Sequence, residues 1–322
     1  MPRLAPPLLA LAAVAAAAVA AAVALGSVPI APLELARVLL GDGEPLHRTL
    51  VLELRAPRAL AAFAVGGLLA VAGALMQILL RNPLADPYVL GLSGGAAVGA
   101  LAAMLAGLAT VLVSGAAFAG ALLSTLLVFG LAHGGGGWTP TRLLLTGVVV
   151  ASGWGALVTF MLAVGSRHQL PGMLYWLMGD LAYAGSPWLA LGVLAAAVLA
   201  AAPLGRSLNV LARGPLQATA LGVAVRPLEW GIYAAASVLT AVAVTTAGSI
   251  GFVGLVVPHM LRLLLGNDQR LILPASALAG GALLAGADVL ARTLIAPEQL
   301  PVGVITALLG VPLFLYLLHR SR

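Results

Sequence analysis

Asp180 and Asp288 are the two acidic residues that could carry chemistry inside a membrane, because each lies in an otherwise apolar stretch of the sequence. Ionisable residues at membrane depth are functional candidates, and two carboxylates indicate a proton-coupled transporter as one possible function. Asp288 also precedes Arg292 by four residues, a spacing that places both side chains on one helix face where they can form an ion pair. A structural role is therefore the favoured interpretation of Asp288.

Other chemistry is excluded by the residue types that the chain lacks. It has no cysteine, and all sixteen of its basic residues are arginines. A phosphate-binding ATPase loop needs a lysine, so this chain cannot hydrolyse ATP by that route. Its five histidines are scattered without the spacing of metal ligands. The sequence therefore predicts no catalytic residue, no metal site and no cofactor, and it indicates that the chain is not an enzyme.

The composition predicts an all-α membrane protein. Hydrophobic residues make up 62% of the 322 residues and charged residues 8%, against roughly 25% charged in soluble domains. A membrane-spanning helix needs about 20 mostly apolar residues. We expect a single domain over residues 1–322, a polytopic bundle of about ten transmembrane helices, at about Leu8–Leu25, Ala59–Leu80, Tyr88–Leu108, Leu112–Leu131, Leu143–Val164, Trp188–Leu204, Gly231–Ala247, Ile250–Leu265, Leu271–Ile295 and Val302–Leu318.

The arginines indicate the orientation of the bundle. With ten spans and the N-terminus inside, ten arginines fall on the cytoplasmic side, and six lie outside: Arg37, Arg48, Arg55, Arg58, Arg167 and Arg292. Cytoplasmic loops carry an excess of basic residues, which favours this orientation with both termini in the cytoplasm. The first apolar run is interpreted as a retained span, with a signal peptide as the alternative.

Three ordered blocks of the sequence resemble one family of transport proteins. They are "LRAPRALAAFAVGGLLAVAGALMQILLRNPLADPYVLGLSGGAAVGA" (Leu54–Ala100), "TAGSIGFVGLVVPHMLRLLLGNDQRLILPASALAGGALLAGADVLAR" (Thr246–Arg292) and "QLPVGVITALLGVPLFLYLL". They resemble the FecCD or BtuC-like permease subunits of type II ABC importers, which take up vitamin B12, haem and ferric siderophores. The resemblance implies a homodimer in the bacterial inner membrane, two separate ATPase subunits and a periplasmic substrate-binding protein. It implies no nucleic-acid partner.

The resemblance also implies roles for residues at both ends of the bundle. Arg55, Arg58 and Arg292 correspond to the arginines that dock the binding protein, with snorkelling to lipid headgroups as the alternative. Asn82, Leu84, Thr139 and Thr141 correspond to the cytoplasmic gate. Thr141 could instead cap the helix that follows it. The glycine run 134–137 and Pro140 depart from the family's pattern before this turn.

A polar segment at about 206–228 corresponds to the pair of short cytoplasmic helices that the family inserts into a groove on each ATPase. Gly214 can end one helix and Pro215 can begin the next. Apolar side chains then mediate helix-in-groove recognition. The residues expected to couple to the ATPase are Leu208, Leu211, Arg213, Gly214, Leu221 and Gly222, and a plain interfacial helix is the alternative.

The cargo is the least determined part of the interpretation. Met173, Tyr175, Trp176 and Asp180 are expected to line the outer cavity, where they suit a large and partly apolar cargo. The stretch "YWLMGDL" resembles cobalamin permeases more than siderophore permeases. The sequence thus favours a metal-chelate import permease with cobalamin as cargo and haem or a ferric siderophore as alternatives. A proton-coupled secondary transporter and a membrane scaffold are the rival functions.

Overall fold

The computed structural model describes residues 5–133, 139–182 and 184–320, so Arg3, Arg322 and the glycine run 134–137 lie outside the described residues. All regular structure in the described part is helical. Each of the ten predicted runs forms a helix: α1 (Ala5–Ala24), α4 (Ala56–Leu79), α5 (Leu92–Leu105), α6 (Thr110–Ala132), α7 (Pro140–Val164), α9 (Trp188–Ala201), α12 (Val225–Ala247), α13 (Val253–Leu265), α14 (Gln269–Thr293) and α15 (Val302–Arg320).

Shorter helices connect these ten. They are α2 (Pro32–Leu40), α3 (Pro45–Arg48), the π-helix η1 (Thr49–Arg55), the 3₁₀-helix η2 (Pro87–Leu90), α8 (Leu170–Met178), α10 (Gly205–Leu211) and α11 (Pro215–Ala220). Within the described residues, six helices are long and apolar enough to cross a membrane, and the pair α9–α10, bent by 73°, makes a seventh. Helices α5, α13 and part of α15 are apolar but shorter. The prediction of an all-α polytopic bundle of about ten helices is confirmed.

Helix α4 is the centre of the bundle, because α12, α13 and α14 all pack against it. Its side chains are buried along nearly the whole helix. Glycine permits this close packing: a Cβ atom at Gly66 would lie 2.2 Å from the carbonyl oxygen of Gly280 on α14. A Cβ atom at Gly73 would lie 1.8 Å from the carbonyl oxygen of Gly254 on α13. Small residues at these crossings let the backbones touch, as is typical of helix packing in membranes.

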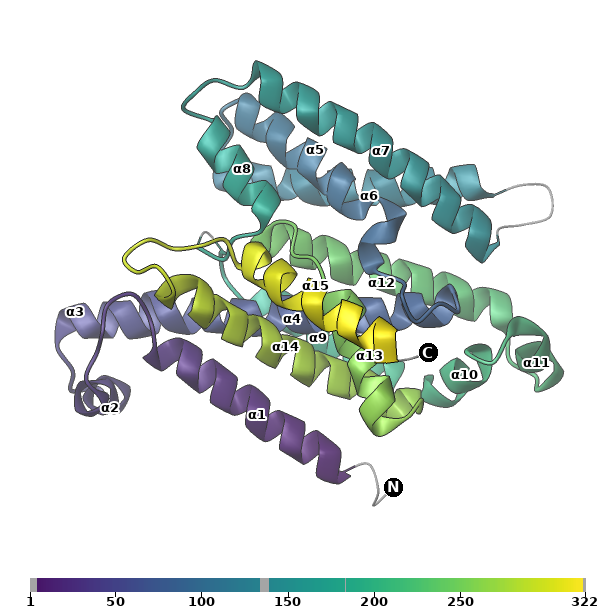
Figure 1. Ribbon diagram of the computed structural model, residues 1–322, viewed down its shortest axis with the longest axis horizontal. Coiled ribbons are helices and arrows are strands. Elements are labelled where there is room, and N and C mark those ends of the chain that lie inside the picture. The colour runs from purple at the N-terminus through teal and green to yellow at the C-terminus, as the bar shows by residue number, and fades with distance from the viewer. Residues whose placement is uncertain (1–4, 134–138, 183, 321–322) are drawn as a thin grey trace.

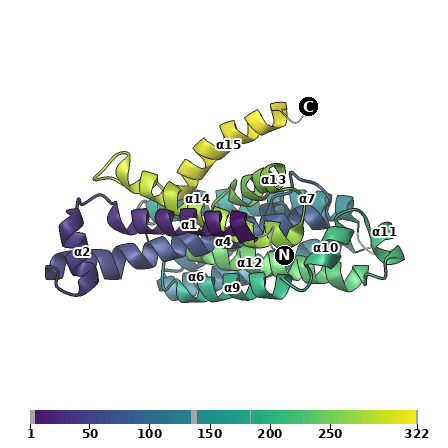
Figure 2. The same ribbon diagram turned by 90° about the horizontal axis from the view of Figure 1, so that it is seen from below.

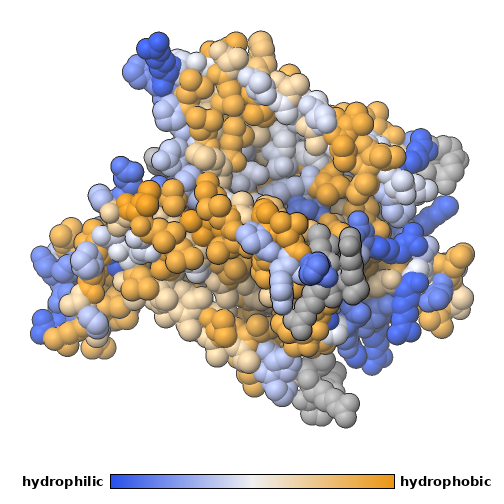
Figure 3. Space-filling view, in the orientation of Figure 1, coloured by the Kyte–Doolittle hydropathy of each residue, from blue (hydrophilic) through white to orange (hydrophobic). Residues whose placement is uncertain are grey.

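The bundle has two ends that differ in their short helices. In Figure 1, α2 and α3 lie at one end, and α10 and α11 lie at the opposite end together with the start of α1 and the finish of α15. Hydrophilic residues gather at both ends in Figure 3, with a largely hydrophobic surface between them. We name these the α2–α3 end and the α10–α11 end.

Helices α7 and α15 are among those whose apolar side chains are scarcely covered by the rest of the described chain. Only 6% of the most apolar window of α7 is buried. Figure 2 shows α15 leaning away from the other helices toward its C-terminal end, and several of its large apolar side chains, among them Leu308 and Leu315, are exposed. These surfaces would face lipid or a second protein chain.

Candidate functional site

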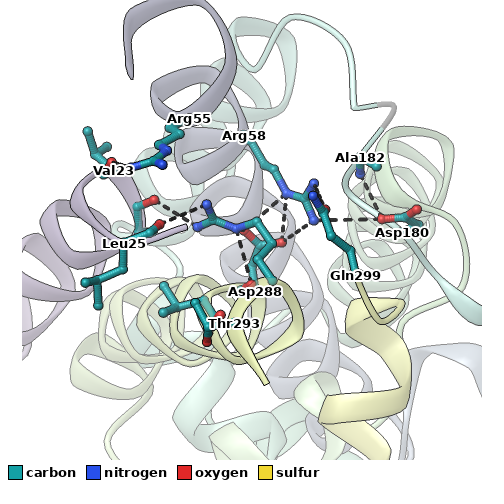
Figure 4. Close-up of polar contacts among 12 residues, drawn as sticks. Val23, Leu25, Arg55, Arg58, Asp180, Ala182, Asp288, Thr293 and Gln299 are labelled. Atoms are coloured by element: carbon teal, nitrogen blue, oxygen red, sulfur yellow. Dashed lines mark hydrogen bonds and ion pairs between the residues drawn. The ribbon is translucent and has the colours of Figure 1, made fainter. Parts of the chain in front are cut away.

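Asp288 is the centre of an ion-pair cluster at the α2–α3 end. Its side chain is fully buried, and its carboxylate lies 2.8 Å from Nη2 of Arg58 and 2.9 Å from Nε of Arg292. Figure 4 shows Arg58 beside this carboxylate, with dashed lines for their contacts. Arg58 Nη1 also donates to Gln299 Oε1 at 2.9 Å. The predicted pair between Asp288 and Arg292 is confirmed, and Arg58 joins it from α4, 230 residues away in the sequence.

The other donors of the cluster hold the C-terminal end of α1. Arg292 donates to the carbonyl oxygens of Leu25 at 3.0 Å and Ala22 at 2.8 Å. Arg55 donates to the carbonyl oxygen of Ala24 at 2.8 Å and to that of Val28. The last carbonyls of a helix have no partner within the helix, and basic side chains near them satisfy these groups and the helix dipole. The arginines therefore fasten α1 to η1 and α14.

The three predicted docking arginines thus lie together, but mostly inside the chain. Arg55 is 7% exposed and Arg292 is 4% exposed. With Arg58 they line a cleft of about 320 Å³ that also includes Glu53 and Gln299. The guanidiniums of Arg55 and Arg292 donate to backbone carbonyls, and Arg292 also donates to Asp288. The prediction of docking arginines had treated both as free charges on the surface. Of these three arginines, only Arg58 is partly exposed to solvent.

Asp180 connects this cluster to a neighbouring cavity. Its Oδ1 accepts a hydrogen bond from the backbone N–H of Ala182 at 2.8 Å and lies 3.9 Å from Nη2 of Arg58. The cavity has a volume of about 380 Å³ and lies beside α8, where Tyr175, Trp176 and Asp180 line it as expected. His168 and Gln169 also line it, although no pattern in the sequence singled them out.

Met173 is the exception to the predicted cavity lining. Its side chain is fully buried and packs in a cluster with Ala100 and Ala117 of the neighbouring helices and Ala241 of α12. In a helix of nine residues, one face must pack against the protein while the other can face a cavity. Met173 lies on the packed face, so its assignment as a cavity residue was wrong.

The two short helices at the α10–α11 end form as predicted, and their leucines divide into two groups. Leu208 and Leu211 are 1% and 2% exposed and belong to the core, so their prediction as contacts for the ATPase was wrong. Leu216 and Leu221 are 87% and 71% exposed. The inner leucines hold α10 against the bundle, and the outer leucines are left for contact with another molecule.

Glycine and proline set the boundaries of these helices. Gly214 has φ of 127° and Gly222 has φ of 79°, backbone conformations that favour glycine. Pro215 then begins α11, as the sequence predicted. Arg213 is exposed between the two helices. The segment therefore consists of two short helices joined by a turn, with an outward apolar face at Leu216 and Leu221.

A polar clamp that the sequence did not reveal holds α10 to the start of α14. Asn209 Nδ2 donates to Asp268 Oδ1 at 2.9 Å, and the backbone N–H of Gln269 donates to Asn209 Oδ1 at 2.7 Å. Asp268 also pairs with Arg270 at 2.7 Å. Hydrogen bonds from Arg270 and Asn209 hold the pKa of Asp268 well below its usual range. The sequence signal was an asparagine between Leu208 and Leu211, because a half-buried amide packed among core leucines must find hydrogen-bond partners.

The predicted gate residues lie in two separate segments. Asn82 Oδ1 accepts from the backbone N–H of Leu84 at 3.0 Å and shapes the turn after α4, with Leu84 exposed. Thr139 Oγ1 accepts from the backbone N–H of Arg142 at 3.2 Å and caps α7. Thr141 lies inside the helix, so the proposed cap at Thr141 was wrong by two residues. Within the described residues, no hydrogen bond joins the two segments.

A trio of hydrogen-bonded groups links α7, α6 and the end of η2. Trp154 Nε1 donates to Ser124 Oγ at 2.9 Å, and Ser124 Oγ donates to the carbonyl oxygen of Gly91 at 2.9 Å. Trp154 lies in α7 and Ser124 in α6, and Gly91 is the residue that ends η2. Because η2 follows the Asn82 turn and α7 follows Thr139, this contact connects the elements that carry the two gate segments. Sequence spacing gave no sign of it.

The model of the FecCD transport family matches residues 13–320 of this chain. The chain belongs to that family. It is 46% identical over 273 residues to the cobalamin import system permease protein BtuC of Halobacterium salinarum, with 83% of this chain and 72% of the relative covered. It is 42% identical to the hemin transport system permease protein HmuU of Yersinia pestis, with 84% and 83% covered.

A solved structure agrees with the assignment to the FecCD family. It is described as an inward-facing conformation of a metal-chelate type ABC transporter, and it matches with a TM-score of 0.83 at 28% identity over 97% of this chain and 98% of its own. PsaBC of Streptococcus pneumoniae, at 19% identity and a TM-score of 0.58, shares the fold. This FecCD family member is therefore a multi-pass membrane permease subunit of an ABC transporter. ATP hydrolysis belongs to a separate chain.

Proposed function

We propose that this chain forms the membrane pathway of an importer for a metal chelate in the cytoplasmic membrane, driven by two ATPase subunits. The observation that carries the proposal is the α10–α11 pair. Its inner leucines and the Asn209 clamp fix it to the bundle, while Leu216 and Leu221 present an apolar face outward. A rigidly mounted helix pair with an exposed apolar face suits insertion into a groove of a moving partner.

The α2–α3 end is the proposed docking site for a substrate-binding protein. The cleft beside Arg58 is lined by three arginines and Glu53, and an acidic side chain of the partner would complement its positive charge. Arg55 and Arg292 then have an indirect role: both hold the end of α1, and Arg292 shares Asp288 with Arg58 and so helps to position it. The orientation that follows places this end outside the cell and both termini in the cytoplasm.

Cobalamin is the first cargo to test. The relative with 46% identity is named for cobalamin import, which supports this choice, and the relative named for hemin keeps haem as the alternative. The cavity beside Tyr175 and Trp176 offers aromatic surface with few charges. Such a lining suits passage of a large chelate without tight binding.

A second copy of the chain is the proposed partner for α7 and α15. Both helices expose apolar side chains, and Gly153 and Gly155 on α7 leave room for a neighbouring backbone. Close approach of small residues favours helix association in lipid. A homodimer would place one pathway between two such surfaces.

A proton-coupled transporter is not favoured. Asp288 is fully buried and paired with two arginines, so it is closed to solvent. Asp180 is engaged by Ala182 and lies beside Arg58. A proton carrier needs alternating access to water on both sides of the membrane. Asp288 has no such access, and Asp180 reaches only the cavity beside α8.

Uptake of labelled cobalamin, haem and a ferric siderophore tests the proposal. Cells lacking this permease would be complemented with its gene and with either an active or a hydrolysis-deficient partner ATPase. We expect uptake of one cargo with the active ATPase and background uptake with the inactive one. Equal uptake in both strains would refute ATP-driven import.

A further inference from the structure

A basic cavity of about 640 Å³ lies at the α10–α11 end, between the turn that carries Asn82 and the loop that joins α10 to α11. It is bounded by the end of α4, the turn that follows it, α10, the end of α13 and the loop before α14. Arg81, Arg213 and Arg262 line it, together with Asn209, Asp268 and Gln269. Three guanidiniums around one hollow require an explanation, because like charges repel each other.

Two of the three arginines have no partner within the described part of the chain. No hydrogen bond or ion pair is formed by the guanidinium of Arg81 or of Arg213, and both residues are exposed. Glu229 acts on Arg81 electrostatically without pairing with it. Arg81 also has φ of 49°, an uncommon backbone conformation for a residue with a side chain. Backbone strain of this kind is often found at functional sites.

The acid in the cavity does not neutralise these arginines. Both carboxylate oxygens of Asp268 accept from Arg270, and Oδ1 also accepts from Asn209. Arg270 does not line the cavity. Arg262 is partly engaged by Gln77 and by the carbonyl oxygen of Ala74. The cavity therefore retains a net positive charge.

Gln269 supplies a second, independent observation. Its side chain is buried and lines the cavity, yet its Oε1 has no hydrogen-bond donor among the described residues. Buried polar atoms are nearly always paired, so a rotation of the Gln269 amide toward the cavity would let this oxygen gain a donor from a ligand, such as a hydroxyl group. A ligand that carries an anion and a hydroxyl would match the arginines and this amide.

The position of the cavity indicates where that ligand comes from. It lies at the ends of α4 and α13, where the apolar surface meets the hydrophilic α10–α11 end (Figure 3). In a membrane, a boundary between apolar and hydrophilic surface is expected near the phospholipid headgroups, and basic pockets between membrane helices bind anionic headgroups. Arginine matches the geometry of phosphate oxygens.

We propose that this cavity binds the headgroup of an anionic phospholipid such as phosphatidylglycerol. Arg81 and Arg213 contact its phosphate, Arg262 adds positive charge from the inner wall, and Gln269 Oε1 accepts from a headgroup hydroxyl. The lipid joins the turn before the gate segment to the loop between α10 and α11. The inference does not depend on which cargo is carried.

Native mass spectrometry of the purified full-length permease tests the site. After mild delipidation, the protein would be mixed with phosphatidylglycerol, with phosphatidylcholine or with inorganic phosphate, and retained ligand would be counted. We expect roughly a tenfold preference for phosphatidylglycerol over phosphatidylcholine. The double variant Arg81→Gln, Arg213→Gln should lose it. Arg206→Gln, an exposed α10 change outside the cavity, should keep it.

Several outcomes would overturn the proposal. Equal retention of both lipids by the wild type would do so, as would an unchanged preference in the double variant. Retention of inorganic phosphate to the same extent would identify a site for free anions. Normal lipid retention by the double variant with loss of ATPase co-purification would assign the arginines to that interface. Arg81→Lys, Arg213→Lys keeps the charge and should retain the preference, which controls for misfolding.

Discussion

Arginine has opposite roles at the two ends of this bundle. At the α2–α3 end, Arg55 and Arg292 are buried, and their donors go to the end of α1 and to Asp288. At the α10–α11 end, Arg81 and Arg213 are exposed and have no partner within the described residues. The first pair holds helices together, and the second is available to another molecule.

The comparison shows that the role of an arginine depends on its burial and on the backbone carbonyl oxygens within its reach. A buried guanidinium must satisfy its donors within the protein, since an unpaired buried charge is costly. An exposed guanidinium is hydrated and can exchange water for a ligand. The following predictions test this contrast, from the largest expected effect to the smallest.

Asp288→Ala should have the largest effect, because it leaves Arg58 and Arg292 facing each other without a carboxylate. Removing one partner from a buried ion pair costs about 3–5 kcal/mol. We expect this loss in the free energy of unfolding, measured by thermal or denaturant unfolding in detergent. Arg213→Gln is the matched control at the other end and should stay within about 0.5 kcal/mol of wild type. Equal stability of both variants would remove the distinction between the two ends.

Leu211→Ala and Leu221→Ala test the two faces of the coupling helices. Leu211 is buried, so its truncation should cost about 3 kcal/mol of stability. Leu221 is exposed, so its truncation should leave stability nearly unchanged and weaken co-purification of the ATPase. If Leu221→Ala keeps full ATPase binding while the protein is folded, the exposed face is not the interface.

Arg55→Gln should loosen the end of α1. It removes charged hydrogen bonds to the carbonyl oxygens of Ala24 and Val28, which we expect to cost about 1–3 kcal/mol. Faster hydrogen exchange at residues 22–28 than in wild type would reveal the local loosening. Arg48→Gln, a change in α3 outside this cluster, serves as the comparison. Unchanged exchange in both variants would contradict the fastening role.

Asp268 should give the smallest effect, and it depends on pH. Its pKa is lowered in the folded protein, chiefly by hydrogen bonds from Arg270. A lowered pKa means that the ionised form stabilises the fold above the usual carboxylate pKa of about 3.9, and that this stability is lost as the pH falls through the folded value. The group is partly exposed, so we expect about 1 kcal/mol or less. Asp268→Asn should lack this acid-dependent loss in unfolding midpoints measured between neutral and acidic pH.

Local patterns predicted the elements of this fold well. Ten apolar runs became ten helices, and Gly214 with Pro215 marked the turn between α10 and α11. The i, i+4 spacing of Asp288 and Arg292 predicted their ion pair. These successes depend on contacts between residues that are close in the sequence, where helix geometry alone places the side chains.

Contacts between residues that are far apart in the sequence could not be predicted from it. Arg58 and Asp288 meet because α4 and α14 pack together, and the clamp of Asn209 on Asp268 depends on the bend after α9. The burial of Met173 and Leu211 depends on the rotation of short helices whose apolar residues face several directions. When nearly every side chain is apolar, hydrophobic periodicity no longer distinguishes the inner face from the outer one.

Helix α14 joins the two ends in a single piece. Its first residues are clamped to α10 through Asn209, and its last turns carry Asp288 and Arg292. With 25 residues it measures about 37 Å at 1.5 Å per residue. Such a rod transmits displacement as a lever does, so a tilt of about 3° at one end would move the other by about 2 Å. A movement of α10 would then displace the α2–α3 end directly, without a chain of side-chain rearrangements through the membrane. Distances between spin labels placed at the two ends of α14 and on the neighbouring α4 would measure this displacement.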